Sequence, residues 1–129
     1  MTAAIVRRFG GEPASVSEAR AWLADLLRPL PVVDDAVIVV SELAANAVTH
    51  TLSARGGYTV AVCHTGPGRL RLLVSDLGGP TSPVLGDADD DSEYGRGLHV
   101  VAALVTDWGV TVNHAGRTVW AELEWKSRQ

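Results

Sequence analysis

Two pairs of β-forming segments, each joined by a short turn that contains glycine, most constrain what this chain can fold into. The first pair flanks Gly66-Pro67-Gly68, and the second flanks Ala115-Gly116. Links this short join strands that run antiparallel, so each pair predicts a β-hairpin. The four segments are residues 58–65, 69–75, 108–113 and 117–125.

Helical spacing dominates between these hairpins, and a short strand over residues 4–9 opens the chain. Ser15 and Glu18 form a candidate capping box for a first helix. A second helix runs from about Asp34 to Thr51, and a third begins around residues 96–98 and carries an apolar side inward. Its inward residues are Val100, Val101, Leu104 and Val105. About five strands and three helices, grouped rather than alternating, predict an α+β two-layer sandwich with a mixed, mostly antiparallel sheet and helices on one face.

The composition is that of one globular domain over residues 1–129, of which 47% are hydrophobic. No apolar run is long enough to span a membrane, and the N-terminus has no apolar stretch of the length that a secretory signal needs. The single cysteine, Cys63, cannot form an internal disulfide. We therefore expect a cytoplasmic protein with no membrane partner.

The charge balance argues against direct binding to nucleic acid. Eleven basic and fifteen acidic residues give a net charge of −4, and Lys126 is the only lysine. Affinity for a phosphate backbone depends on clustered positive charge, which this chain lacks. The charge does not exclude a compact anionic ligand, because a few aimed dipoles and one or two cations can hold it.

Two polar residues in the second helix are the first candidates for chemistry. Glu42 and Asn46 are four positions apart, so they project from one face about one turn, or ~6 Å, apart. We expect them, with His50, on the face opposite the apolar side that contains Val40 and Ala44. Such a stripe is often only a solvated helix face. In so apolar a helix it also suits a Mg²⁺ ion bound to phosphates, with the carboxylate left to act as a general base.

Two glycine-bearing segments follow. Asp76-Leu77-Gly78 comes directly after a strand, and either forms a plain turn or offers a carboxylate to the exocyclic amine of adenine, with Gly78 allowing close approach. Gly95-Arg96-Gly97-Leu98 opens the third helix. It is either a flexible helix start or a site where backbone N–H groups and Arg96 receive phosphate oxygens. Each signal is weak alone, but their order and spacing favour nucleotide binding.

Taken together, these motifs resemble the GHKL superfamily of ATP-binding domains, most closely the bacterial anti-sigma factor serine kinases and their stand-alone relatives. The segments that carry the resemblance are residues 41–50, similar to the N box; 74–78, similar to the adenine-binding G1 box; 94–101, similar to the G2 box; and 116–120, similar to the closing G-[KR]-T strand. The resemblance spans about residues 5 to 125 and implies a Bergerat-type ATP-binding fold.

The resemblance also implies roles for individual residues. Glu42 would be the general base, Asn46 the Mg²⁺ ligand, and Asp76 the reader of adenine. The other residues of an ATP pocket would be His50, Gly78, Gly95, Arg96, Gly97, Leu98 and Thr118, the last helping to hold the adenine.

By the same resemblance, the protein would bind a sigma factor, usually as a homodimer, and phosphorylate a serine on an anti-anti-sigma antagonist. The alternative is a catalytically silent module that binds partners in response to nucleotide. A third possibility is a protein-interaction scaffold that binds no nucleotide. Apolar residues of the first helix, Trp22, Leu23 and Leu26, would suit an interface if they are exposed.

Overall fold

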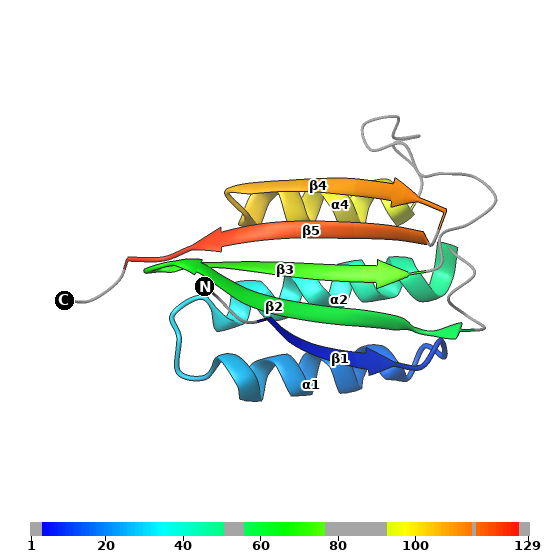
Figure 1. Ribbon diagram of the computed structural model, residues 1–129, viewed down its shortest axis with the longest axis horizontal. Helices are drawn as coiled ribbons and strands as arrows, with labels where there is room; N and C mark the ends of the chain where they lie inside the picture. Colours follow the sequence, from blue (N-terminus) through cyan, green and yellow to red (C-terminus); the bar gives the residue numbers. More distant parts are fainter. Residues whose placement is uncertain (1–3, 51–55, 77–92, 115, 127–129) are drawn as a thin grey trace.

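The structure is a computed structural model, and it describes residues 4–50, 56–76, 93–114 and 116–126. Figure 1 shows a single sheet with helices on one side of it. The elements are β1 (Ile5–Phe9), α1 (Ser15–Leu27), α2 (Val33–His50), β2 (Tyr58–Gly66), β3 (Arg69–Asp76), α4 (Glu93–Leu104), β4 (Asp107–Asn113) and β5 (Gly116–Glu124).

The sheet has five strands in the order β1-β2-β3-β5-β4, and every pairing between these strands is antiparallel. Both predicted hairpins are present, as β2–β3 and β4–β5. The central contact joins β3 to β5, which are distant in sequence and pair from Arg69 opposite Glu124 to Asp76 opposite Arg117. The predicted α+β two-layer sandwich with a largely antiparallel sheet is confirmed.

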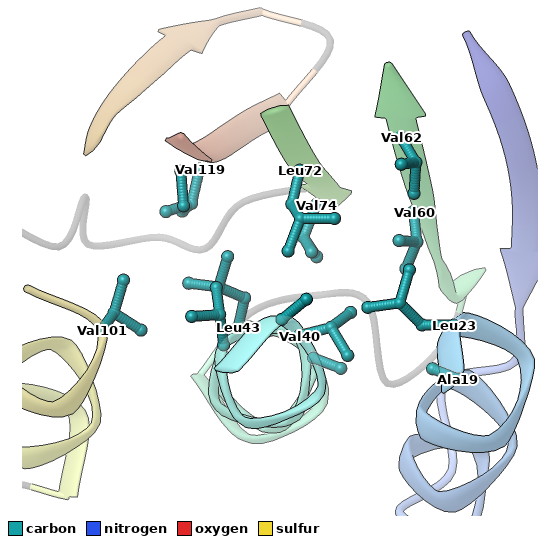
Figure 2. Packing of buried hydrophobic residues seen from close by; sticks show 14 of the residues in the cluster. Ala19, Leu23, Val40, Leu43, Val60, Val62, Leu72, Val74, Val101 and Val119 are labelled. Carbon is teal, nitrogen blue, oxygen red and sulfur yellow. The ribbon is translucent and has the colours of Figure 1, made fainter. Parts of the chain in front are cut away.

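The three helices of the described residues, α1, α2 and α4, form the second layer. In Figure 1 they lie behind the sheet, and Figure 2 shows α2 between α1 and α4. Side chains of α2, including Val40 and Leu43, point at the sheet residues Leu72, Val74 and Val119. Alternate residues of β3 and β5 are buried under this layer because successive side chains of a strand point to opposite faces. Each large apolar side chain buried in this way contributes roughly 1.5–3 kcal/mol.

One apolar expectation is wrong in detail, and one open question is answered. Val100 was expected to face inward, but it is 40% exposed, whereas its neighbour Val101 is fully buried. Adjacent residues on a helix point about 100° apart, and the described part of α4 buries only a narrow stripe, so Val101 is buried while its neighbour Val100 is exposed. Leu23 is fully buried, and Trp22 and Leu26 pack partly buried against the core. These three side chains of α1 therefore pack against the interior of the protein and do not form an exposed patch.

Ser15 does not form the predicted capping box. The N-cap position of α1 is Ala14, which makes no side-chain capping bond, and Ser15 is fully buried in the first turn. Its Oγ lies 3.1 Å from the phenol oxygen of Tyr58 on β2. Burial raises the pKa of Tyr58, and the hydrogen bond with Ser15 partly offsets that rise. The serine therefore ties the helix to the sheet.

We predict that Ser15→Ala and Tyr58→Phe are strongly non-additive. Each single change leaves one buried hydroxyl without its partner, which costs about 1–3 kcal/mol of unfolding free energy. The double variant removes both groups and should cost clearly less than the sum of the two. Urea denaturation of the four proteins measures the coupling. Simple additivity would show that the two hydroxyls do not interact.

Candidate functional site

Several candidate residues gather at one end of the sandwich. In Figure 1 the arrowhead of β3, the first residues of β5 and the end of α2 all lie at the right-hand end. Antiparallel pairing produces this, because β5 begins where β3 stops. Asp76 is the last residue of β3, and Arg117 is the second residue of β5. The C-terminal half of α2, with Asn46 and His50, runs toward the same end.

Glu42 and Asn46 occupy successive turns of α2, as predicted, but they do not lie on a face opposite the core. Asn46 is 8% exposed, and Glu42 is half-buried. The reason is that Asn46 follows the buried Leu43 by three positions and precedes the buried Ala47, so it lies on the flank of the buried stripe. A buried carboxamide needs polar partners. His50 is the last residue of α2, and its side chain lies outside the described residues.

Asp76 makes a buried ion pair with Arg117. The guanidinium Nη2 donates to Oδ2 of the carboxylate at 3.0 Å, and both side chains are 2% exposed. The two residues are opposite each other in the β3–β5 ladder, and both continue the buried alternation, after Val74 and before Val119. The alternation of side chains along β3 and β5 thus places these two charged groups on the face of the sheet that the helices cover. Burial of either charge alone would be costly, so the pairing is what makes their position tolerable.

Thr118 is not brought together with Asp76. It is the next residue after Arg117 on β5, so its side chain points to the other face of the sheet. There its Oγ1 lies 2.8 Å from Oγ of Ser75, its partner in the ladder. The side chain that faces Asp76 is Arg117, to which we gave no role from the sequence. The same alternation that predicts Val119 as buried extends back to position 117 and could have identified it.

The Gly95-Arg96-Gly97-Leu98 segment was predicted to open the third helix, and it lies just inside that helix. Helix α4 begins at Glu93, earlier than the predicted start around residues 96–98. Gly95 and Arg96 fall in the first turn, where the N–H groups of a helix have no carbonyl of the same helix to bond. That position suits an anionic ligand on the backbone. Gly78, by contrast, lies outside the described residues.

The described residues contain no group of three or more His, Cys, Asp or Glu side chains that could hold a metal ion. Within the described helices, none is both long enough and apolar enough to cross a membrane.

Comparison with known proteins identifies the family. The model of the histidine kinase-like ATPase domain matches residues 9–123. This match covers most of the chain, so the chain belongs to the histidine kinase-like ATPase domain family. The family is one of ATPase domains, which implies that the domain binds ATP. No curated protein matches the sequence.

Solved structures show the same fold. One is the crystal structure of the RsbU and RsbW domains of Rv1364c from Mycobacterium tuberculosis, with a TM-score of 0.70 and 21% identity over 95% of this chain. Another is the blue-light activated histidine kinase EL346 of Erythrobacter litoralis, with a TM-score of 0.51 and 21% identity over 87% of this chain. The chain spans only 32% and 41% of those two chains. At this identity the likeness establishes the fold alone.

The buried pair makes a prediction about stability. Asp76→Ala leaves the Arg117 guanidinium buried without its carboxylate partner and should lower the unfolding free energy by roughly 3–5 kcal/mol. The matched control is Glu124→Ala, since Glu124 faces Arg69 on the same two strands at 4.0 Å with both side chains about half exposed. An exposed pair of this kind contributes only about 0–1 kcal/mol. Urea denaturation of both variants and the native chain, carried out without nucleotide, measures the two losses of unfolding free energy. Equal losses would show that burial gives the Asp76–Arg117 pair no special weight.

Proposed function

We propose that this protein is an ATP-dependent protein serine/threonine kinase of the anti-sigma factor type. It would phosphorylate a serine on an anti-anti-sigma antagonist and control a sigma factor by partner switching. The observation that carries the proposal is the family match over residues 9–123 in a chain that keeps Glu42 and Asn46 one turn apart on α2. The motif resemblance to anti-sigma factor serine kinases, and the fold shared with a structure that includes an RsbW domain, support the regulatory part.

The donor set fits a magnesium nucleotide. A buried carboxylate at position 76 is a hydrogen-bond acceptor, which is the group needed to receive the amino group of adenine. The buried amide oxygen of Asn46 is an oxygen ligand of the kind Mg²⁺ prefers. The first turn of α4, with Gly95 and Arg96, offers backbone N–H groups to phosphate oxygens. Bound ATP would supply the phosphoryl group that is transferred.

Glu42 is the residue of this chain that we assign to the chemistry. It lies one turn before Asn46 and is half-buried, so it can approach a hydroxyl held beside the phosphate chain. There the carboxylate takes the proton of the substrate serine as the serine oxygen bonds to the γ-phosphorus and the bond to ADP breaks. We propose further that the protein acts in the cytoplasm as a homodimer.

Glu42→Gln should separate catalysis from binding. The amide keeps the size of the side chain but cannot accept the proton, so phosphotransfer to the antagonist should fall by roughly 10²–10⁴-fold. Binding of ATP should change little, because the residue is not assigned to the nucleotide. A phosphotransfer assay with labelled ATP and Mg²⁺ measures the rate, and calorimetry measures the affinity. Glu18→Gln, an exposed change on α1, is the matched control.

The same assay separates the proposed kinase from its alternative. Binding of ATP with no transfer by the native chain, and no difference in Glu42→Gln, would favour the catalytically silent module. Failure of millimolar ATP and Mg²⁺ to raise the melting temperature would favour a scaffold without nucleotide, because a ligand selective for the native state must stabilise it.

Asn46→Ala tests the proposed metal ligand. If Asn46 holds Mg²⁺ beside the phosphates, the variant should lose at least about tenfold in ATP affinity when Mg²⁺ is present, the scale on which weakened metal sites lose affinity. With the metal chelated, the variant and the native chain should bind ATP equally. Calorimetry under both conditions measures this, and Thr49→Ala, exposed on the same helix, is the control. An equal loss in both conditions would assign Asn46 to the nucleotide or to the fold and not to the metal.

A further inference from the structure

We propose that Arg117 is a positioning residue that sets the base preference of the site. By holding Oδ2 of Asp76, it would present the carboxylate as an acceptor and keep its own donors away from the base. The site would then select a 6-amino purine over a 6-oxo purine. This inference rests on the proposed function, because it assumes that Asp76 receives the base of a bound nucleotide.

The geometry gives Arg117 this position. The two residues are direct partners in the β3–β5 ladder, so the backbone pairing fixes their separation. Both side chains are 2% exposed, and the Nη2 to Oδ2 distance of 3.0 Å is that of a charge-assisted hydrogen bond. The atoms packed around such a buried pair restrict the movement of both side chains, in addition to the attraction between their charges. Arg117 therefore has little freedom to leave Asp76 without disturbing the strands.

The chemistry of the two groups gives opposite preferences for a purine. A carboxylate accepts hydrogen bonds, so it favours the amino group of adenine and repels the 6-oxo group of hypoxanthine or guanine. A guanidinium only donates, so an unrestrained Arg117 at this place would favour the 6-oxo group. The hydrogen bond from Nη2 to Oδ2 engages that nitrogen of the guanidinium with Asp76, and this contact would hold Arg117 to the carboxylate. Base preference thus depends on a residue that need not touch the base.

Other ion pairs of the sheet lack this arrangement. Arg71 and Glu122 are 3.3 Å apart, with 37% and 16% of their side chains exposed, and Arg71 lies 4.4 Å over the ring of Trp120. Arg71 alternates with the buried Leu70 and Leu72, so it is on the face without helices. Among the described residues, Asp76 and Arg117 are the ion pair that lies under the helical layer at the end of β3.

The test compares the affinities of ADP and IDP, which differ at position 6 of the base, in the full chain by calorimetry. We expect the native chain to prefer ADP. Arg117→Gln should lower the ratio of ADP to IDP affinity by about tenfold, the scale of one hydrogen bond to a charged group. Arg117→Lys, which keeps the charge, should restore most of the ratio. Arg69→Gln, which removes the exposed pair with Glu124, should leave the ratio unchanged.

The ratio of ADP to IDP affinity distinguishes a positioning role of Arg117 from a purely structural one. A structural role would lower the affinities for ADP and IDP together and leave their ratio unchanged. An unchanged ratio in Arg117→Gln, or tighter ADP binding, would overturn the inference and leave the proposed function standing. No binding of ADP or ATP by the native chain would overturn both. If Arg117→Gln does not fold, the structure of the native chain with ADP decides. Arg117 still bonded to Asp76, with Asp76 on the 6-amino group, supports the inference, and Arg117 turned away from Asp76 overturns it.

Discussion

The pairing of β3 with β5 is the interaction on which the rest of this structure depends. It joins two hairpins made by distant parts of the chain into one five-stranded sheet. Without it, the sheet would divide into a three-stranded unit, β1-β2-β3, and the β4–β5 hairpin, and an isolated hairpin is at best marginally stable in water. With it, the alternating side chains of both strands form a continuous buried surface under α2. Hydrophobic burial on that surface supplies most of the stability.

The same ladder produces the unusual polar feature of the domain. Because β3 and β5 keep their alternation to the end, Asp76 and Arg117 are carried to the buried face in place of two apolar residues. A buried ion pair is a weak source of stability compared with apolar residues of similar size. Its presence at the end of the sheet where α2 and β3 both finish is therefore better explained by a function of the site than by a contribution to stability. Recognition of a nucleotide base is the function that we propose.

Much of the fold could be predicted from local patterns, and the failures have identifiable causes. Hairpins, helices and their order follow from spacing within about ten residues, and they agree with the structure to within a few positions at most ends. Ser15 was misassigned because a capping pattern and a buried contact use the same residue type, and Tyr58 is 43 positions away. Val100 is exposed because α4 buries only a narrow stripe that contains Val101, and a run of apolar residues does not reveal how wide the buried stripe of a helix is. The family resemblance placed Glu42, Asn46 and Asp76 in order, but their roles stay predictions.

What the sequence determined by itself is the set of elements, the apolar parity of each strand and the one-turn spacing of Glu42 and Asn46. These are properties of neighbouring residues, which share backbone geometry and side-chain periodicity. Only the tertiary structure decided that the β3–β5 register places Arg117 opposite Asp76, and that Asn46 lies on the flank of the core. The register between distant strands and the packing of a helix depend on which surfaces meet, and no stretch of adjacent residues encodes that choice.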